Sequence, residues 1–370
     1  MHVVVTGAAG FVGSHLAHRL LDAGHRVTGI DRLFAARVDA RVPLDPALAT
    51  VGSTTADPDE PDGWGSRTGG WNPLAGTDAA LPSVAAMPGI SGTAGTDLAD
   101  HRLAIAWRQL TARPRFKGVV ADLTTAVLLP LLTGADAVVH LAARPGFRDS
   151  WSSFPDYLRD NAQATSAVGL ACLGAGVPRL VNASSSAVYG RIAQGDESSP
   201  LQPVSPYGVS KVAAEQTVAA LHRTMGLSVV TVRLFSVYGS RQRPDMGIYR
   251  AIDAVLGDRP FPLFGDGSQT RSLVHVSDVV GGLVGAVSGG EPGAVYNLAG
   301  RAEHSMAEIL DEIGRQLGAR PQTGAVQVPA EEPIHAAVDS SRAAAELGFI
   351  PSMGLAEGVA EQIAWQRALA

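Results

Sequence analysis

The stretch HVVVTGAAGFVGSHLAHRLLDAGHRVTGID, residues 2–31, decides the fold class. It begins with a short, β-branched apolar run over residues 2–6, and a second such run covers residues 25–30. Residues 11–23 between them repeat apolar side chains at helical spacing, and Gly24 ends that pattern. A strand, a glycine turn, a helix and a second strand form one βαβ unit, the building block of a doubly wound parallel sheet.

Three glycines, Gly7, Gly10 and Gly13, form the turn between the first strand and the helix. They permit a tight turn and a close approach of the backbone to a pyrophosphate, and the start of the helix offers free N–H groups to the phosphates. Asp31 lies 18 residues past Gly13, where a carboxylate can bind both ribose hydroxyls of an adenosine and repel a 2′-phosphate. The pattern predicts a dinucleotide site that prefers NAD. Arg32 next to Asp31 keeps NADP open, and a purely structural turn is the other interpretation.

The alternation of strands and helices resumes near residue 116. Further strands are predicted at 116–123, 136–143, 179–185 and 228–235, with helices near 155–175 and 205–225. Continuous apolar strands between helices are typical of a parallel sheet covered on both faces, which indicates an α/β fold. Ligands bind beyond the carboxyl ends of such strands. Asp122 is therefore a candidate contact for the adenine amino group. Ala142 and Ala143 are small enough to let a cofactor pass, unless their size serves packing only.

An irregular insertion is predicted over about residues 38–96. Much of it is rich in Gly and Pro and shows neither strand nor helix period, whereas connections in α/β domains are normally a few residues long. Trp64 and Trp71 within it could bind a partner or form a lid, or the insertion could be passive. A helix is predicted over 97–112, with apolar side chains on one side at Leu98, Leu103, Trp107 and Leu110.

Composition argues against several classes of partner. The net charge is −6 and no run of five like charges occurs, so nucleic acid is not an expected partner. No apolar run approaches the roughly 20 residues of a membrane span, and the N-terminus lacks signal-peptide features, so we expect no membrane association and a cytoplasmic location. A single cysteine, Cys172, excludes an internal disulfide, and the ten histidines show no metal-ligand spacing, so no metal is predicted.

Ser184, Ser185 and Ser186 stand at the end of a predicted strand, and Tyr207 and Lys211 follow on a predicted helix. A spacing of four places the phenol and the ammonium on one helix face, so the cation, helped by a positive nicotinamide ring, favours the phenolate. A phenolate is a general base, and a serine hydroxyl across a sugar can share the substrate proton. The chain holds two lysines among 29 Lys and Arg residues, which supports a specific use for the ammonium of Lys211.

Six motifs outside the insertion carry a family resemblance. They are TGAAGFVG (6–13), HLAA (140–143), NASSSAVYG (182–190), YGVSK (207–211), RLFSVYG (233–239) and FGDGSQTRSLVHVSDV (264–279). At these residues the sequence resembles the extended short-chain dehydrogenase/reductase family, the nucleotide-sugar epimerases and dehydratases. The resemblance implies a Rossmann doubly wound parallel sheet with tightly held NAD, and a smaller, discontinuous C-terminal domain that binds a nucleoside diphosphate sugar.

The resemblance also implies domain boundaries and an assembly. The NAD-binding domain is expected at 1–189, 204–235 and 276–299, and the nucleotide-sugar-binding domain at 190–203, 236–275 and 300–370. The two helical patterns near 155–175 and 205–225 are expected to form the four-helix interface of a homodimer.

Roles carried over by position make Tyr207 the base, Lys211 the residue that holds the nicotinamide ribose, and Ser185 the hydroxyl partner, flanked by Ser184 and Ser186. The residues expected to contact NAD are Gly7, Gly10, Phe11, Val12, Gly13, Asp31, Arg32, Asp122, Leu123, Leu141, Ala142, Ala143, Tyr207 and Lys211. Those expected to contact a UDP-sugar are Arg148, Ser184, Ser185, Ser186, Tyr207, Ser236, Arg243 and Arg271. Among them, Arg271 is the expected diphosphate clamp, and Ser236 stands where the family often has Asn.

The subclass follows from residues that differ from the family's other members. Dehydratases show an Asp-Glu pair where this chain has Ser186 and Ala187, and UDP-glucuronate decarboxylases show a Glu at the place of Ala187. RPGFRDSW (144–151) and RQRPDMG (241–247) are similar to segments of UDP-glucuronate 4-epimerases. Arg243 thus falls where a guanidinium could bind the C6 carboxylate bidentately, although a surface ion pair is the alternative.

The resemblance therefore predicts epimerisation of UDP-glucuronate to UDP-galacturonate at C4. Tyr207 is expected to remove the C4 hydroxyl proton while the C4 hydride passes to NAD and returns to the other face of a transient 4-keto sugar. The alternatives are a UDP-glucose/galactose 4-epimerase, a decarboxylase or dehydratase of the same fold, and a non-catalytic NAD sensor. The nucleotide base is not determined by the sequence.

Overall fold

The computed structural model describes residues 1–33, 94–329 and 332–369. The predicted insertion at 38–96, including Trp64 and Trp71, lies outside the described residues up to residue 93. The side chain of Leu98 also lies outside them. No helix in the described part of the chain is long and apolar enough to cross a membrane.

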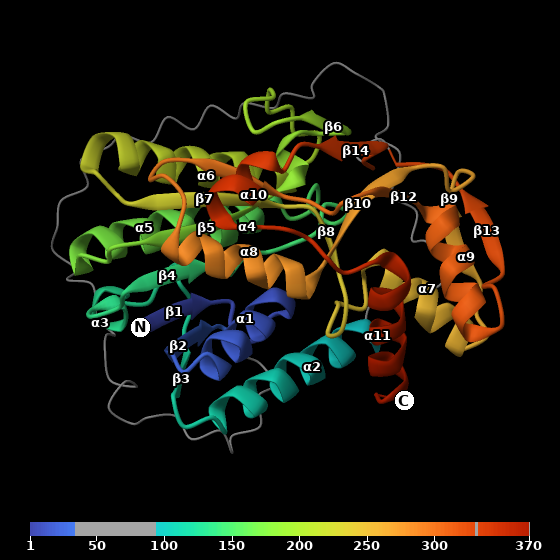
Figure 1. The fold of residues 1–370 in the computed structure, drawn as a ribbon, viewed down its shortest axis with the longest axis horizontal. Helices are drawn as coiled ribbons and strands as arrows, with labels where there is room; N and C mark the ends of the chain where they lie inside the picture. The colour runs from blue at the N-terminus through green and yellow to red at the C-terminus, as the bar shows by residue number, and fades with distance from the viewer. Residues whose placement is uncertain (34–93, 330–331, 370) are drawn as a thin grey trace, which may run out of the picture.

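Seven parallel strands form the central sheet, in the order β11-β7-β5-β4-β1-β2-β3 (Figure 1). They are β1 (His2–Thr6), β2 (Arg26–Asp31), β3 (Phe116–Val120), β4 (Ala137–His140), β5 (Leu180–Ser185), β7 (Val229–Leu234) and β11 (Val295–Leu298). The chain adds β2 and β3 on one side of β1 and then crosses to β4 on the other side. Binding sites in such sheets lie at this reversal of strand order, beyond the carboxyl ends. The predicted doubly wound α/β fold is confirmed.

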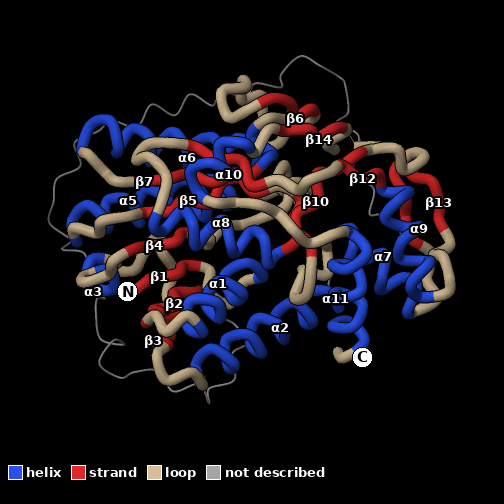
Figure 2. Tube along the Cα trace, viewed as in Figure 1, coloured by secondary structure: helices blue, strands red, loops and turns tan. Residues whose placement is uncertain are grey.

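Helices cover both faces of the sheet (Figures 1 and 2). One layer contains α1 (Phe11–Asp22), α2 (Ala94–Thr111) and α8 (Val276–Ser288), and the other contains α3 (Leu129–Leu132), α5 (Ala164–Ala175) and α6 (Pro206–Met225). Val3 and Val5 of β1 pack in the core of the first layer, and Val4 packs in that of the second. This alternation explains why β1 carries three consecutive apolar residues, because both of its faces are buried.

The sequence-based elements differ from the observed ones in two places. β3 ends at Val120 rather than at residue 123, because Asp122 begins a turn in which its carboxylate accepts the N–H of Thr124 at 2.8 Å. The helix predicted near 155–175 is divided into α4 (Phe154–Tyr157), a π-helical segment η2 (Leu158–Gln163) and α5. The seventh strand, β11, was not predicted, since its four residues include the fully buried amide Asn297.

The C-terminal part assembles short elements, several of which pack around a separate apolar core. Its strands are β6 (Ile192–Gly195), β8 (Ser236–Tyr238), β9 (Phe261–Phe264), β10 (Thr270–His275), β12 (Glu303–Ser305), β13 (Thr323–Val326) and β14 (His335–Val338). Its helices are α7 (Gly247–Leu256), α9 (Met306–Leu317), α10 (Ser341–Leu347) and α11 (Leu355–Arg367). Ile252, Phe261, Leu310 and Ile363 pack together in this core, although they are far apart in sequence. The elements that carry them, α7, β9, α9 and α11, lie side by side (Figure 1).

Candidate active site

The glycine turn has the close backbone packing that the sequence predicts. Gly7 has a φ of +70°, and a Cβ built on it would lie 2.8 Å from the backbone nitrogen of Ala142. A Cβ on Gly13 would lie 2.0 Å from the carbonyl oxygen of Gly7, which no side chain can do. No side chain caps the start of α1 at Gly10, so its first N–H groups are available to an anion. These features fit the diphosphate of a dinucleotide.

Asp31 ends β2 beside this turn. Its carboxylate accepts hydrogen bonds from the backbone N–H groups of Ala9 and Leu33, each at 3.0 Å. Burial raises the pKa of Asp31, and these hydrogen bonds oppose the rise. Arg32 forms an ion pair with Asp160, with 3.1 Å between Nη1 and Oδ2. Burial works to raise the pKa of Asp122 as well, but its hydrogen bonds with Thr124 and the charges of Arg32 and Arg159 together lower it.

Tyr207 and Lys211 lie in the first two turns of α6, next to the carboxyl end of β5. The ammonium of Lys211 donates a 2.7 Å hydrogen bond to the carbonyl oxygen of Ala183. Burial lowers the pKa of Lys211 to about 8, although the charge of Glu215 raises it in part. The Ser185 hydroxyl lies close enough to the Tyr207 phenol to lower its pKa, so the structure brings the two predicted partners together.

Arg243 supplies the charge that acts on Tyr207 in this structure. Burial raises the pKa of the phenol, while the nearby Ser185 hydroxyl and the charge of Arg243 lower it by a smaller amount. The ring of Tyr157 stands edge-on to that of Tyr207, with centroids 6.1 Å apart. The protein groups alone thus leave the pKa of Tyr207 above its usual value. The expected lowering through Lys211 and a nicotinamide ring stays a prediction.

Arg243 belongs to the loop after β8, in the C-terminal part of the chain, and it lies near the phenols of Tyr207 and Tyr157. Its Nε and Nη2 donate to the two carboxylate oxygens of Asp245, at 2.9 and 2.7 Å. The ion pair that the sequence left open is therefore present, and the guanidinium nevertheless lies close enough to Tyr207 and Tyr157 to act on the pKa of both. Ser236 begins β8, which runs parallel to β10, and it pairs there with Leu273.

The other predicted substrate residues lie on separate elements. Arg148 stacks over the rings of Phe147 and Phe264, with 5.9 and 5.2 Å to the centroids. Arg271 on β10 forms an ion pair with Glu332, and it also donates to the carbonyl oxygen of Thr270. Its use as a diphosphate clamp stays a prediction.

The serine triplet ends β5 and begins the short helix η3 (Ser186–Val188). Ser184 is 5% exposed, and its hydroxyl has no hydrogen-bond partner within the part of the chain that the structure describes. A buried hydroxyl without a partner is costly unless a ligand satisfies it. The Oγ of Ser185 accepts the N–H of Ala187 at 3.2 Å, which orients it beside Tyr207.

Asn161 is a site residue that sequence reasoning missed. Its amide accepts the N–H of Arg144 at 2.7 Å and donates to the Ser210 hydroxyl at 2.9 Å. Ser210 in turn donates to the carbonyl oxygen of Tyr207 at 2.7 Å. The π-helical segment η2 carries Asn161, so it connects the loop after β4 to the start of α6. The sequence signal for this residue was the polar pair Asp160 and Asn161, which interrupts an apolar helical pattern.

A buried ion pair behind Lys211 was also missed. Arg233 on β7 donates to both carboxylate oxygens of Glu215, at 3.0 and 2.8 Å, and both side chains are 4% exposed. The Tyr189 hydroxyl also accepts from Arg233, at 2.7 Å. Glu215 is four residues beyond Lys211 on α6, and a charged residue on the same helix face was the available signal.

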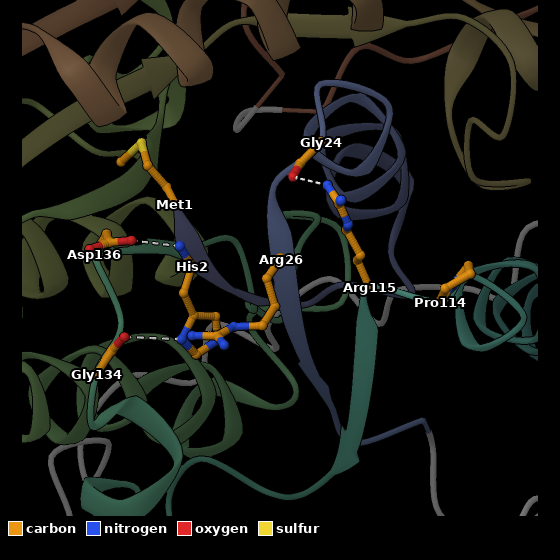
Figure 3. A pocket seen from close by; sticks show the side chains of 8 residues that line it. All are labelled: Met1, His2, Gly24, Arg26, Pro114, Arg115, Gly134 and Asp136. Atoms are coloured by element: carbon orange, nitrogen blue, oxygen red, sulfur yellow. Dashed lines mark hydrogen bonds between the residues drawn. The ribbon is translucent and has the colours of Figure 1, made fainter.

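An open pocket of about 590 Å³ lies at the opposite edge of the sheet (Figure 3). It is lined by Met1, His2, Gly24, Arg26, Pro114, Arg115, Gly134 and Asp136. The backbone N–H of His2 donates to Asp136, and Arg115 donates to the carbonyl oxygen of Gly24. Because this pocket is at the amino ends of the strands, it is remote from the residues that follow their carboxyl ends.

A larger cavity of about 920 Å³ adjoins the predicted site. Its lining includes Gly10 and Phe11 of the glycine turn as well as Arg243. The cavity therefore connects the start of α1 with the cation beside Tyr207.

A model of the NAD dependent epimerase/dehydratase family matches residues 3–60 and 87–299. The chain belongs to this family. Its fold is the Rossmann-type fold of extended short-chain dehydrogenases, and its cofactor is NAD.

Relatives match over the whole chain or most of it. The Bacillus subtilis (strain 168) protein named uncharacterized UDP-glucose epimerase YtcB is 31% identical over 376 residues, which covers 100% of this chain and 99% of the relative. A dTDP-glucose 4,6-dehydratase of Streptomyces griseus is 35% identical over 257 residues, covering 68% of this chain and 78% of the relative. The solved structure of UDP-glucuronic acid 4-epimerase from Bacillus cereus in complex with UDP-glucuronic acid and NAD has a TM-score of 0.80 and 28% identity, with 100% of both chains covered. These names agree with an isomerase of the nucleotide-sugar 4-epimerase type, and they include different sugars.

Proposed function

We propose that this protein converts UDP-glucuronate to UDP-galacturonate by NAD-dependent epimerisation at C4. One observation carries the proposal: the guanidinium of Arg243 lies close enough to Tyr207 for its charge to lower the pKa of the phenol. A general base and a cation suited to a carboxylate therefore belong to one site. Ser186 and Ala187 supply no carboxylic acid beside them, which disfavours dehydration. The similarity to a UDP-glucuronic acid 4-epimerase is additional support.

The residues of this chain would move the proton and hold the sugar. Bound NAD supplies reversible hydride transfer at C4. Tyr207 takes the proton of the C4 hydroxyl and returns it after the sugar ring has turned, and Ser185 keeps the phenol and that hydroxyl within hydrogen-bond reach. Lys211, anchored on Ala183 at the end of β5, is placed to hold the nicotinamide ribose.

Retention of the carboxylate is the second task of the proposed site. A 4-keto uronate is a β-keto acid, and it loses carbon dioxide when the carboxyl bond aligns with the carbonyl π system. Arg243 can bind the carboxylate through two parallel hydrogen bonds, and the buried Ser184 hydroxyl can donate a third. Together with Ser186, these donors would keep the carboxyl bond out of alignment.

Incubation of the NAD-loaded protein with UDP-glucuronate, followed by proton NMR of the sugar products, tests the proposal. UDP-galacturonate is the expected product, and Tyr207→Phe is expected to lose turnover by about 10²-fold or more. UDP-pentose as the main product would instead identify a decarboxylase. Unchanged turnover in Tyr207→Phe would contradict the assignment of the base.

A neutral-sugar 4-epimerase is the second candidate. Asp245 already neutralises Arg243, and an Arg243–Asp245 pair makes no demand for a substrate carboxylate. The relative named as a UDP-glucose epimerase points the same way. A panel of UDP-glucose, UDP-galactose and UDP-glucuronate separates the two functions by the ratio of kcat/KM values, and a larger value for the neutral sugars would overturn the uronate proposal.

We also propose a homodimer formed through α5 and α6. Leu158 of η2, Leu170 of α5 and Val209 of α6 are exposed apolar side chains on the segments expected at the interface. Light scattering on the eluting protein is expected to give the mass of two chains for the native protein and of one chain for Leu170→Glu. Ile350→Glu changes an apolar side chain that is even more exposed, outside these helices, and should leave the dimer intact.

A further inference from the structure

The guanidinium of Arg243 already binds a carboxylate of the protein itself, that of Asp245. Asp245 accepts from both Nε and Nη2, which is the bidentate arrangement that the proposed function assigns to the C6 carboxylate of the sugar. Asp245 and Arg243 are two residues apart in the loop between β8 and α7. The pair is therefore local, and it forms without help from any distant element.

The two partners differ in their exposure to water. The Asp245 side chain is 62% exposed, whereas that of Arg243 is 35% exposed and its charge reaches Tyr207 and Tyr157. An exposed ion pair contributes little net free energy, because a separated carboxylate regains its hydration. Asp245 can therefore leave Arg243 at small cost, while the guanidinium stays beside the phenols.

A second cation lies within electrostatic reach of Asp245. Burial works to raise the pKa of Asp245, but its hydrogen bonds with Arg243 and the charges of Arg243 and Arg148 hold that pKa below its usual value. Arg148 belongs to the loop that follows β4, and a Cβ built on Gly146 of that loop would lie 3.9 Å from Nη2 of Arg243. It offers an alternative partner to a carboxylate that has left Arg243.

We propose that Asp245 is a specificity-determining residue: it occupies Arg243 as an internal substitute for the substrate carboxylate, and a UDP-hexuronate binds by displacing it. The inference rests on the proposed function and names the competitor at the same site. A neutral hexose carries no group that replaces Asp245, so the ion pair persists when such a sugar binds. The substrate carboxylate exchanges one charged partner of Arg243 for another, and the guanidinium is never left uncompensated.

Asp245→Asn tests the exchange, because the amide keeps the shape and removes the competing charge. Calorimetric titration of the NAD-loaded Tyr207→Phe and Tyr207→Phe/Asp245→Asn proteins measures binding without turnover. The double variant should bind UDP-glucuronate about two- to fivefold more tightly, the range expected for the loss of an exposed competing ion pair, and UDP-glucose with unchanged affinity. Weaker or unchanged binding of UDP-glucuronate would show that Asp245 merely orients Arg243, and would overturn the proposal.

Two further variants make the test specific. Asp245→Glu restores a competing carboxylate and should return the affinity for UDP-glucuronate to that of the parent. Asp311→Asn removes an equally exposed aspartate of α9, which pairs with Arg320, and should change neither affinity. A gain with Asp311→Asn equal to that with Asp245→Asn would reduce the effect to net charge and contradict the proposal.

A readout that needs no uronate separates this inference from the proposed function. Arg243 lowers the pKa of Tyr207, and Asp245 partly cancels that charge. This test uses protein that retains Tyr207. Asp245→Asn should move the acid limb of the pH profile of kcat/KM to lower pH, for whichever UDP-hexose the native protein turns over. If only neutral sugars react, the proposed function fails, and this limb still tests whether Asp245 occupies Arg243 and masks its charge at Tyr207, the part of the inference that needs no uronate. An unmoved limb overturns it.

Discussion

The glycine turn and the surroundings of Arg243 are built in opposite ways. The turn belongs to one continuous βαβ unit, and its geometry is set by backbone atoms that approach to distances at which no Cβ fits. The site around Arg243 joins the end of β5, the start of α6 and the loop after β8, and it depends on charges that have alternative partners. We therefore expect steep, all-or-none losses from changes in the first region and graded changes of selectivity in the second.

The steepest loss is expected at Gly13. A methyl group in Gly13→Ala would meet the carbonyl oxygen of Gly7 at 2.0 Å, so the turn must open, with a loss of at least about 3 kcal/mol of folding free energy and of bound NAD. Urea denaturation and the NAD content of the purified protein measure both. Gly281→Ala in α8, where nothing lies within 4 Å, should be neutral or stabilising. Normal NAD content in Gly13→Ala would contradict the steric argument.

A loss of stability of comparable size is expected from the ion pair behind Lys211. Glu215→Gln leaves the buried guanidinium of Arg233 without its charged partner, which typically costs about 3–5 kcal/mol. Asp311→Asn removes one partner of an exposed pair and should change the free energy of unfolding by less than about 1 kcal/mol. Equal losses in the two variants, measured by urea denaturation, would mean that burial does not set the strength of this pair.

Lys211 supplies a pH test of the same region. Its pKa of about 8 in the folded protein is below the ordinary lysine value, so the unfolded chain binds more protons between about pH 8 and 10. The Lys211 contribution to stability is therefore least favourable below pH 8 and improves as the pH rises through that window. Relative to Lys211→Met, the native protein should gain about 1–3 kcal/mol of unfolding free energy from pH 7 to 10. A constant difference would show that the ammonium is not desolvated.

The smallest expected effect concerns the choice of dinucleotide. Asp160 holds Arg32, and Asp160→Asn weakens that hold, so the guanidinium can turn toward a 2′-phosphate. We expect the ratio of NADP to NAD affinity, measured with cofactor-free protein, to rise about three- to tenfold. Asp156→Asn serves as the control, because this neighbouring, more exposed aspartate shares Arg144 with Asp160 and forms no ion pair with Arg32 among the described contacts. An unchanged ratio would leave Asp31 as the sole determinant.

Local patterns predicted the sheet well because a strand buried on both faces and a glycine turn are recorded in consecutive residues. The prediction was least accurate where tertiary contacts override the local pattern. β11 contains Asn297, whose side chain accepts from Tyr189 more than a hundred residues away, so its polarity hides the strand at one edge of the sheet. The π-helical segment with Asn161 interrupts a helix whose sequence reads as continuous, because its amide serves the loop after β4 and α6 at once.

The sequence by itself determined the βαβ start, the parallel sheet, and the residues Tyr207, Lys211 and Ser185, since spacing along one helix or one strand end suffices to bring such groups together. Only the tertiary structure decided which charges act on them. Arg243 comes beside Tyr207 from another part of the chain, and Asp245 and Asp160 occupy cations that the sequence showed only as isolated arginines. Electrostatic interaction depends on distance through space and on burial, and neither is written in the spacing of residues along the chain.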